Sequence, residues 1–457
     1  MKELKKNDII TLQITSLTSE GSGIGRAENG MAVFVPFTSV GDILQCRIVK
    51  VCKNYCYGKI ESLITPSPFR IEADCGVYGK CGGCVYRHIS YAAECEAKLK
   101  IVTDAFERIA GVSPQCDGII AADEVDRYRN KAQYPVTQTG GKLACGFYAS
   151  RSHRVVAIDD CPLQPKVFSE IVKVCLECME KAHITAYSEE SGRGEVRHIY
   201  LRRGYNSGEI MLCIVAARDI SKKLMQMCQT VVQSFPEVKS IVLNINSKNT
   251  NVILGEKCVT LFGSDTITDI MCGNVVELSP LSFYQVNTAQ AQRLYAKAFE
   301  YAAPQSGDVI ADLFCGAGTI GLSMAKRTND VKIIGVEQVA QAVENAKRNA
   351  ERNGITNATV YCGDAGEVFS RLRESGCAPD VIVVDPPRKG CSELTIETIA
   401  KAAPKRIVMV SCDPATAARD VKRLMQYGYT CSRLCAVDMF PRTSHVETIV
   451  LLSRAAD

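Results

Sequence analysis

The chain has 457 residues, of which 46% are hydrophobic and 23% are charged. This balance is typical of folded globular proteins and excludes a disordered or fibrous chain. The length predicts about three domains. The net charge of +4 is too small to identify a nucleic-acid partner, so the distribution of charge along the chain is more informative than its total.

The chain carries no apolar segment that resembles a signal peptide, and no segment approaches the ~20 apolar residues of a membrane span. We therefore expect a cytoplasmic protein with no membrane partner. In that compartment the 23 cysteines indicate reduced thiols, metal ligands or nucleophiles rather than disulfides. No segment indicates an obligate protein partner, and we expect a monomer.

The N-terminal segment has the pattern of a small β-barrel. Residues 8–61 alternate apolar and polar residues over short runs that are separated by glycines. The Pro-Ser-Pro at 66–68 then breaks the chain. We therefore assign residues 1–62 to a first domain.

The second predicted domain, residues 63–280, has mixed α+β character. Apolar residues at helical spacing predict a helix over 91–111, and apolar runs predict strands over 198–201 and 210–217. The segment contains no fixed-period repeat that would indicate a solenoid.

A basic stretch in this domain suits nucleic acid. From Arg127 to Arg154 there are six Lys or Arg and no acidic residue, interleaved with aromatic residues. This mixture offers phosphate pairing and base stacking. A solvated hairpin whose aromatic side chains face a core is the alternative. Arg127, Arg129 and Lys131 are the candidate RNA-binding residues.

Four cysteines of this domain form a candidate metal site. Cys75, Cys81 and Cys84 lie within ten residues around flexible glycines, and Cys161 offers a fourth thiol downstream. Four thiolates suit Zn or an iron–sulfur cluster. The spacing matches neither the usual paired zinc spacing nor the ferredoxin runs, so the choice stays open, with free thiols as a further alternative.

Residues 281–457 form the third predicted domain, in which apolar strands alternate with helical stretches. The strands are expected at 309–314, 332–336, 359–362, 380–384 and 406–410. This alternation is typical of the α/β class with a doubly wound parallel sheet. In such sheets ligands bind beyond the carboxyl ends of the strands, so the residues that follow each strand form the candidate site.

The first three strand ends suit a nucleotide cofactor. Gly316 and Gly318 allow the turn after the first strand to approach a cofactor closely. Glu337, which closes the second strand, suits ribose hydroxyls of either NAD or S-adenosylmethionine. Asp364 closes the third strand and offers a carboxylate to an adenine edge. These three ends do not distinguish the two cofactors.

The fourth strand ends in Asp385-Pro-Pro. Two prolines stiffen the loop and direct the Asp385 carboxylate and neighbouring carbonyls toward one spot, which suits a planar, hydrogen-bonding substrate beside the cofactor. A rigid turn without a binding role is the alternative.

Two further residues are candidates for chemistry. Cys412 follows the fifth strand and precedes a helix, whose dipole is expected to lower the pKa of the thiol and favour a nucleophilic thiolate. A buried inert thiol is the alternative. Glu447 lies just ahead of an apolar run, where burial would raise its pKa and favour proton transfer near neutral pH. The alternative places Glu447 on an edge that faces water.

Six motifs occur along the chain: Cys75/Cys81/Cys84/Cys161, Phe283-Tyr-Gln285-Val-Asn287, Asp312-Leu-Phe-Cys-Gly-Ala-Gly, Asp385-Pro-Pro-Arg-Lys-Gly, Ser-Cys412-Asp-Pro and His-Val-Glu447-Thr. Together they resemble the RNA uridine-5-methyltransferase family, and most of all its 23S ribosomal RNA branch. Residues 1–62 resemble the TRAM barrel of that branch. The resemblance covers nearly the whole chain.

The resemblance implies a class I methyltransferase fold that uses S-adenosylmethionine, and a 4Fe–4S cluster on the four cysteines. It implies that the cofactor and the target pocket are contacted by Gln285, Phe314, Glu337 and Asp385. It also implies that Cys412 is the nucleophile and Glu447 the base. Finally, it implies that a helix near 92–111 packs with the third domain, which would make the middle domain discontinuous.

The expected function is methylation of a uridine in 23S rRNA at carbon 5, with S-adenosylmethionine as methyl donor. Carbon 5 is too weak a nucleophile unaided, so attack of Cys412 on carbon 6 would activate it, and Glu447 would later remove the carbon-5 proton. The target base must first leave its stack.

Three alternatives remain. Transfer RNA is the alternative substrate. A methyltransferase for exocyclic base amines also carries Asp-Pro-Pro, but it needs no thiol, and an aromatic residue is usual where this chain has Arg388. The third is a non-catalytic iron–sulfur RNA-binding module, which the complete set of strand-end residues disfavours.

Overall fold

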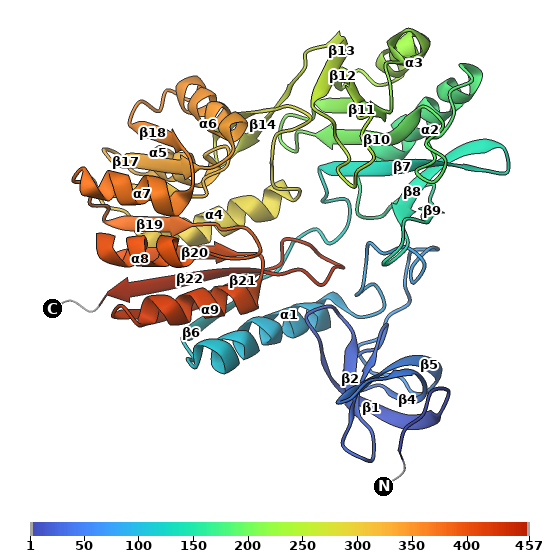
Figure 1. The fold of residues 1–457 in the computed structure, drawn as a ribbon, viewed down its shortest axis with the longest axis horizontal. Coiled ribbons are helices and arrows are strands. Elements are labelled where there is room, and N and C mark those ends of the chain that lie inside the picture. The colour runs from blue at the N-terminus through green and yellow to red at the C-terminus, as the bar shows by residue number, and fades with distance from the viewer. Residues whose placement is uncertain (1–2, 455–457) are drawn as a thin grey trace.

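The structure is a computed structural model that describes residues 3–454. Its strands form a closed barrel, a seven-stranded sheet, a two-stranded hairpin and an eight-stranded sheet. Figure 1 shows the barrel as a separate unit near the N-terminus, with the two large sheets beyond it. Within the described residues, no helix combines the length and the apolar character needed to cross a membrane.

Five strands close the N-terminal barrel in the order β1-β2-β3-β5-β4. They are β1 (Ile9–Leu17), β2 (Gly23–Arg26), β3 (Ala32–Val35), β4 (Ile43–Val51) and β5 (Tyr55–Thr65). Alternate residues such as Leu12, Ile14 and Leu44 are buried in one core. The predicted barrel is therefore confirmed. Side chains that alternate with a period of two give each strand one face directed into the core.

A buried carboxylate fastens the barrel to the segment that follows it. Asp42 is fully buried and accepts hydrogen bonds from the backbone N–H groups of Ser39 (2.6 Å) and Ser67 (2.9 Å). The Arg70 guanidinium donates to both oxygens of this carboxylate, at 2.7 and 2.8 Å. These contacts join residues on either side of position 62.

The middle of the chain forms a seven-stranded sheet in the order β13-β12-β11-β10-β7-β8-β9. Its strands are β7 (Lys131–Thr139), β8 (Lys142–Tyr148), β9 (Val155–Ala157), β10 (Val196–Arg203), β11 (Ile210–Ala216), β12 (Val238–Ile245) and β13 (Lys257–Gly263). Helices α2 (Lys166–Lys181) and α3 (Ser221–Ser234) pack against it in one core. The strands predicted at 198–201 and 210–217 are therefore confirmed within β10 and β11.

The eight-stranded sheet has the order β18-β17-β16-β19-β20-β22-β21-β6. Its strands are β6 (Gln115–Ile120), β16 (Val309–Leu313), β17 (Lys332–Glu337), β18 (Ala358–Cys362), β19 (Val381–Val384), β20 (Arg406–Ser411), β21 (Tyr429–Val437) and β22 (Glu447–Arg454). The five predicted strands, β16 to β20, are confirmed to within one residue at each end, and they run parallel. The order reverses between β16 and β19, which is where ligands bind in such sheets.

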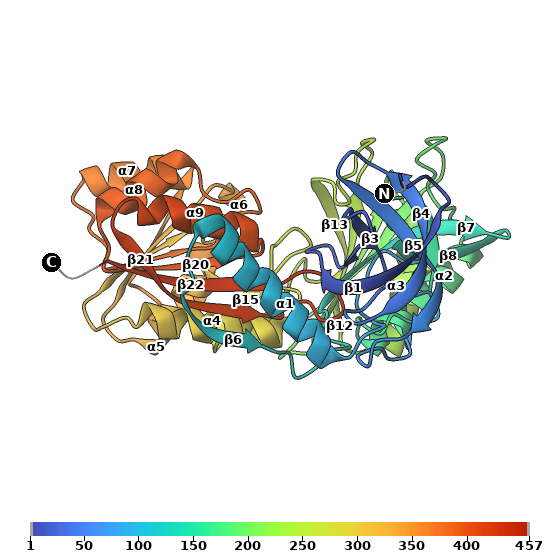
Figure 2. The same cartoon turned by 90° about the horizontal axis from the view of Figure 1, so that it is seen from below.

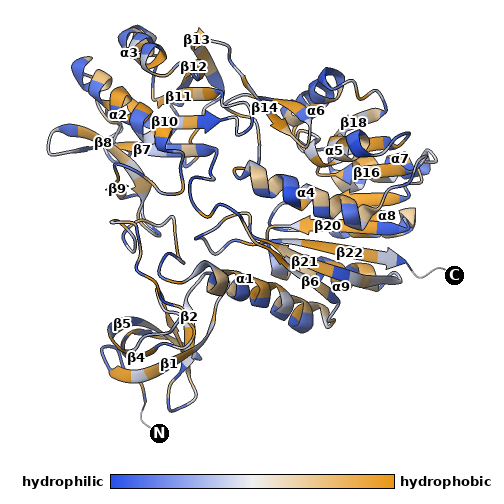
Figure 3. Ribbon diagram, turned by 180° about the vertical axis from the view of Figure 1, so that it is seen from behind, coloured by the Kyte–Doolittle hydropathy of each residue, from blue (hydrophilic) through white to orange (hydrophobic). Residues whose placement is uncertain are grey.

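Helices cover both faces of this sheet (Figure 2). Helices α4 (Thr288–Ala302) and α5 (Thr319–Arg327) pack in the core on one face, and α7 (Ala365–Glu374), α8 (Glu393–Ala402) and α9 (Pro414–Met425) in the core on the other. Helix α6 (Ala340–Arg352) packs beside β17, β18 and the hairpin strand β15 (Asn274–Leu278), which pairs with β14 (Ile267–Met271). Figure 3 shows the central strands as predominantly hydrophobic, as expected for strands buried on both faces.

Residues 91–120 lie with the eight-stranded sheet, although they precede the middle sheet in the chain. Helix α1 (Tyr91–Ala105) continues into a π-helical turn, Phe106–Ala110, which ends at Gly111 in the left-handed region. Val102 and Phe106 are buried in the core that α9 also enters, and β6 adds a parallel edge strand beside β21. The three-domain division stays a prediction. In the structure, residues 91–120 of the predicted middle domain pack with the eight-stranded sheet.

Candidate active site

The glycine-rich turn after β16 lies at the point where the strand order reverses. Phe314, Gly316 and Gly318 all have positive φ angles, of 63°, 55° and 79°, so the turn depends on left-handed backbone. The Gly316 N–H donates to Glu337 Oε2 at 3.0 Å, and Glu337 Oε1 accepts the Val339 N–H at 2.8 Å. Glu337 is therefore held beside the turn, as a residue that contacts a nucleotide there would be.

Asp312, at the end of β16, is a member of this site that sequence reasoning missed. It is 1% exposed, and its Oδ2 accepts the Gly321 N–H at 2.8 Å, whereas Oδ1 has no hydrogen-bond partner among the described residues. Burial, with the nearby charges of Asp385 and Glu337, raises the pKa of Asp312 to about 7. Its position inside a glycine-turn motif was the only signal in the sequence.

Asp364 has a structural contact of its own. Its Oδ1 accepts the N–H groups of Gly366 (2.9 Å) and Glu367 (3.2 Å) and caps the N-terminus of α7. Only the second carboxylate oxygen is left for a ligand, so the predicted contact with an adenine edge has one oxygen to use and stays a prediction.

The loop that carries Asp385 is fixed by helix α9. Cys391 N–H donates to Asp420 Oδ2 at 2.8 Å, and the Thr416 hydroxyl donates to the Arg388 carbonyl at 3.1 Å. Gly390 has a φ angle of 79° and closes a turn onto the Pro387 carbonyl at 2.7 Å. Loss of hydration raises the pKa of Asp385 to about 7, so this carboxyl can be protonated at neutral pH.

Cys412 lies between β20 and α9, as predicted. Asp413 caps α9 by accepting the Thr416 N–H at 2.8 Å. The expected low pKa of the thiol is wrong: burial raises the pKa of Cys412, the nearby Glu447 carboxyl raises it further, and Arg388 opposes this. The helix dipole does not prevail because the thiol is partly buried and faces carboxyl groups.

Glu447 begins β22 and lies next to Cys412. The antiparallel register of β20 and β22 pairs Ser411 with Thr448, which places Cys412 and Glu447 at the same end of adjacent strands. Glu447 is 5% exposed, so the alternative in which it faces water is wrong. Burial, with a contribution from Asp385, raises its pKa to about 8, which confirms the predicted direction.

Arg388 is a second residue whose role the sequence did not reveal. Its charge lowers the pKa values of both Cys412 and Glu447, against the effects of burial. In the sequence, Arg388 indicates only which class of methyltransferase is disfavoured. The signal for this role in the sequence was the position of Arg388 three residues after Asp385. A cation there is close to any negative charge that forms in the site.

Gln285 lies in the loop before α4, which the middle sheet holds in place. Asn130 donates from Nδ2 to the Gln285 carbonyl and from its backbone N–H to the Val286 carbonyl, both at 2.8 Å. Arg202 donates to the carbonyls of Ser279 (2.8 Å) and Ser282 (2.7 Å). The Gln285 side chain itself is partly buried, and its predicted contact with a ligand stays a prediction.

The basic stretch divides into two groups. Arg127 forms an ion pair with Asp160 at 2.6 Å and also donates to the carbonyls of Cys161 and Gln164, so it holds the Cys161 loop. Tyr128 and Tyr134 are buried, so these aromatic side chains face cores as in the hairpin alternative.

Arg129 and Lys131 face the cavity that the cysteines line. Burial, followed by the charges of Arg202 and Arg129, lowers the pKa of Lys131 to about 8. RNA binding by Arg127, Arg129 and Lys131 stays a prediction, and the contacts of Arg127 make it the least available of the three.

Cys75, Cys81, Cys84 and Cys161 line one cavity of about 270 Å³. Among the described residues, no three His, Cys, Asp or Glu side chains lie close enough to hold one metal ion. The choice among Zn, an iron–sulfur cluster and free thiols therefore stays a prediction. Arg87, buried beside them, is held by Asp74 (2.6 Å) and Asp126 (2.5 Å).

Comparison with known proteins agrees with this geometry. Residues 90–455 match the family described as tRNA (Uracil-5-)-methyltransferase, and residues 3–60 match the TRAM domain. The chain is 39% identical over 454 residues to an uncharacterized RNA methyltransferase of Clostridium tetani, covering 99% of this chain and 98% of the relative. It is 40% identical over 452 residues to one of Bacillus cereus, with the same coverage.

A solved structure resembles nearly the whole chain. The tRNA (uracil-54, C5)-methyltransferase of Pyrococcus abyssi, in complex with S-adenosyl-L-homocysteine, is 26% identical with a TM-score of 0.77, covering 97% of this chain and 100% of that chain. The match spans barrel, middle sheet and eight-stranded sheet together. The chain therefore belongs to the RNA uracil-5-methyltransferase family and carries a TRAM domain.

Proposed function

We propose that the protein methylates a uridine of 23S rRNA at carbon 5 through a covalent bond between Cys412 and the uracil ring. One observation carries the covalent mechanism: the register of β20 and β22 brings a thiol and a buried carboxyl together beside Asp385, near the switch point of a methyltransferase sheet. Methylation of an exocyclic amine requires neither a thiol nucleophile nor a base beside it. A strongly raised pKa such as that of Glu447 is typical of catalytic sites, which disfavours a non-catalytic module.

The methyl donor is S-adenosylmethionine, which supplies an electrophilic methyl group on a sulfonium when it is bound. The related Pyrococcus abyssi structure holds its demethylated product. We assign the donor to the turn of Phe314, Gly316 and Gly318, with Glu337 at the ribose and Gln285 and Asp364 nearby. Positive φ angles let the turn backbone approach such a ligand without side chains in between.

Covalent activation begins at carbon 6 of the uracil ring. The Cys412 thiolate forms a bond to carbon 6, and the electron pair of the 5,6 double bond moves to carbon 5 and the carbonyl at position 4. Carbon 5 then bonds to the methyl group, and the donor sulfur keeps the electron pair of the broken bond. Arg388 favours this course because its charge stabilises the thiolate.

The remaining proton is removed by Glu447. The Glu447 carboxylate takes the proton from carbon 5, the double bond re-forms, and the carbon–sulfur bond breaks to release Cys412 as thiolate. Asp385, with a pKa of about 7, is partly protonated at neutral pH, and in that form it can donate a hydrogen bond to the ring and orient it. The pKa of about 8 for Glu447 allows it to gain and lose a proton near neutral pH.

RNA carrying 5-fluorouridine tests the mechanism, because no proton can be removed from carbon 5 once fluorine occupies it. We expect the wild-type protein to form an adduct that survives denaturing electrophoresis. Cys412→Ala should form none, and Cys377→Ala, at a partly buried cysteine elsewhere in the fold, should behave as wild type. An adduct with Cys412→Ala would refute the mechanism.

The substrate is tested by mapping 5-methyluridine in ribosomal and transfer RNA after deletion of the gene and after complementation. We expect a 23S rRNA uridine to lose its methyl group on deletion and regain it on complementation. Transfer RNA is the second candidate, because the structurally similar Pyrococcus abyssi enzyme is described as acting on tRNA. Loss confined to tRNA would establish that alternative.

We further propose that Cys75, Cys81, Cys84 and Cys161 hold a 4Fe–4S cluster with a structural role. The support is that the four thiols line one cavity, beside the buried Arg87. Anaerobically purified protein should contain about four iron and four sulfide per chain. Replacement of Cys81 by Ser should lower both, whereas zinc in the native protein would overturn the assignment.

A further inference from the structure

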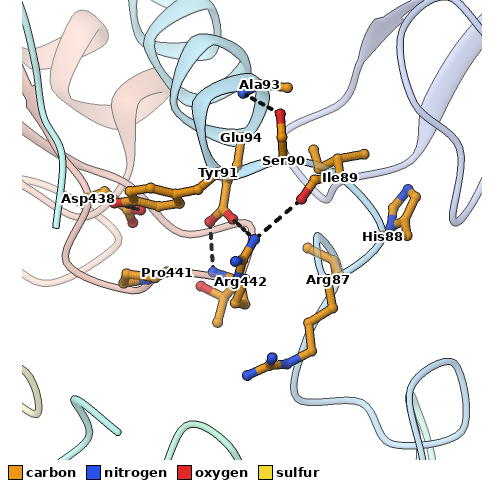
Figure 4. A network of polar contacts seen from close by, with 12 residues as sticks. Arg87, His88, Ile89, Ser90, Tyr91, Ala93, Glu94, Asp438, Pro441 and Arg442 are labelled. Atoms are coloured by element: carbon orange, nitrogen blue, oxygen red, sulfur yellow. Dashed lines mark hydrogen bonds and ion pairs between the residues drawn. The ribbon is translucent and has the colours of Figure 1, made fainter. Parts of the chain in front are cut away.

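A buried cluster of charged groups joins helix α1 to the loop that precedes β22, and Figure 4 shows the part of it around Glu94 and Arg442. Lys98 is fully buried, and its Nζ lies 2.7 Å from Glu94 Oε1 and 2.7 Å from Asp438 Oδ1. The Arg442 N–H donates to the same Glu94 oxygen at 2.7 Å, and the Arg442 guanidinium lies 3.6 Å from the other oxygen. We call these four residues the Lys98 cluster.

A buried ion cluster of this kind is weak evidence for a role in stability. Removing charged groups from water is costly, and well-packed hydrophobic residues often stabilise a fold as much as a buried ion pair does. What the charges add is direction, because each hydrogen bond fixes one atom relative to another. Tyr91 adds a further bond, from its hydroxyl to Asp438 Oδ2 at 2.9 Å.

The loop attached to this cluster is held carbonyl by carbonyl. Residues 438–442 present five successive carbonyl oxygens, and each accepts a hydrogen bond from a different residue. The donors are Gln290 to Asp438 (3.0 Å), Asn287 to Met439 (3.2 Å), Lys98 to Phe440 (3.1 Å), Tyr128 to Pro441 (3.0 Å) and Val85 to Arg442 (2.9 Å). Among these five donors, Lys98 is the one that also forms ion pairs with Glu94 and Asp438.

The same loop leads directly into Glu447. Glu447 is the first residue of β22 and pairs with Val437, the last residue of β21, so it lies at the end of the strand ladder. Residues 438–446 connect the two strands, which is much longer than the connection of a tight hairpin. Ladder ends open more readily than ladder centres, so the position of Glu447 depends on what holds the loop.

We propose that Lys98 is a positioning residue for Glu447: its bonds to Glu94, Asp438 and the Phe440 carbonyl hold the 438–446 loop so that the Glu447 carboxylate stays directed at the uracil ring on Cys412. The inference rests on the proposed function, since only the covalent mechanism gives Glu447 a proton to remove. No local pattern in the sequence indicates this role, because Lys98 and Asp438 are 340 positions apart.

Displacement of Glu447 has a distinctive kinetic consequence. Attack by Cys412 and methyl transfer precede the step that needs Glu447, so slowing that step alone leaves methylated RNA bound covalently to the protein. For Lys98→Met we expect kcat to fall about tenfold or more. The loss should be smaller than the one that follows removal of the base itself, which is ~100-fold or larger. The ratio kcat/KM for RNA should change by less than about twofold, so KM should fall together with kcat, because methyl transfer is irreversible and precedes the step that is slowed.

The matched control is Lys100→Met on the same helix. Lys100 also forms an (i, i+4) ion pair, with Asp104 at 3.0 Å, but its side chain is 63% exposed. Tyr91→Phe is the milder test of the cluster, since it removes one hydroxyl and leaves all the charges. Thermal unfolding of each variant shows which of them are folded.

The experiment follows methyl transfer from labelled S-adenosylmethionine to RNA, and the amount of methylated RNA that remains attached to protein after denaturation. We expect attached RNA to accumulate with Lys98→Met, less with Tyr91→Phe, and not with wild type or Lys100→Met. A folded Lys98→Met protein that has wild-type kcat, or low kcat without attached RNA, would overturn the proposal. If Lys98→Met does not fold, wild-type behaviour of Tyr91→Phe overturns it. Absence of methylation by wild type would refute the proposed function instead.

Discussion

Three carboxyl groups at the edge of the eight-stranded sheet where its parallel strands end have pKa values close to neutrality: about 8 for Glu447 and about 7 for Asp385 and Asp312. Burial is the first cause in each case. Such values suit groups that gain and lose protons during a reaction. The same surroundings disfavour the thiolate of Cys412, so the positive charge of Arg388 is the local feature that opposes them.

The pKa of Glu447 predicts how stability depends on pH. Its folded-state value of about 8 lies above its ordinary value of 4.5, so its contribution to stability is complete below about pH 4.5 and is lost as the pH rises through 8. Glu447→Gln cannot ionise and should therefore be more stable than wild type at pH 8.5 by on the order of 1–3 kcal/mol, with little difference at pH 4.5. Urea unfolding at both pH values measures this.

A gain in stability that is equal at pH 4.5 and pH 8.5 would show that Glu447 does not titrate in this range. Glu447→Gln should still form the covalent bond to RNA, because attack by Cys412 does not need the Glu447 carboxylate, but it should not release the methylated RNA. Stability and activity are thus expected to change in opposite directions, as is common at active sites.

At the scale of elements, helix α9 supports two parts of the site at once. Its N-terminus follows Cys412, and its side chains hold the loop of Asp385 through Asp420 and Thr416. Neighbouring strand ends are thereby kept in one arrangement. The loop has little room for change, since a Cβ atom on Gly390 would overlap the Asp420 carboxylate and the Arg419 guanidinium.

Gly390→Ala should therefore reduce both stability and activity. The substitution adds the overlap with α9 to the strain of a φ angle of 79°, and we expect a loss of about 2–3 kcal/mol together with a lower kcat. Gly376→Ala is the matched control, because Gly376 has a φ angle of 90° but nothing within 4 Å of its Cβ position. It should lose only about 1 kcal/mol and keep its activity. Equal losses would show that the contact with α9 is unimportant.

At the scale of the whole molecule, the barrel is joined to the rest of the chain through Asp42. The Arg70 guanidinium and the N–H groups of Ser39 and Ser67 hold the pKa of Asp42 below its ordinary value, despite burial. This contribution to stability is present above about pH 3.8 and is lost as the pH falls through the lower folded-state value.

Asp42→Asn should loosen the barrel at neutral pH. We expect a loss of about 1–3 kcal/mol and faster proteolytic cleavage between residues 62 and 70, because the charged hydrogen bonds of Arg70 lose their partner. Affinity for long RNA should fall, whereas Glu61→Gln, which removes an exposed ion pair with Arg47, should change little. Cleavage unchanged from wild type would contradict the role of Asp42.

The sequence by itself determined the local architecture. Period-two alternation gave the barrel, and five apolar strands alternating with helices gave the parallel part of the eight-stranded sheet with its ends correct to within one residue. Strand ends then identified Cys412, Asp385 and the glycine turn, because parallel strands bring their carboxyl ends to one edge. Such features depend on residues close together in the chain, and local patterns record them.

Only the tertiary structure decided the rest. It placed β6 at the far edge of the eight-stranded sheet, brought Lys98 to Asp438, and set the pKa of Cys412 above rather than below its usual value. It also showed that the contacts of Arg127 are with Asp160 and nearby carbonyls. Edge pairing, buried ion clusters and pKa shifts arise from contacts between distant segments, and the free energies of those contacts depend on burial that no local pattern contains.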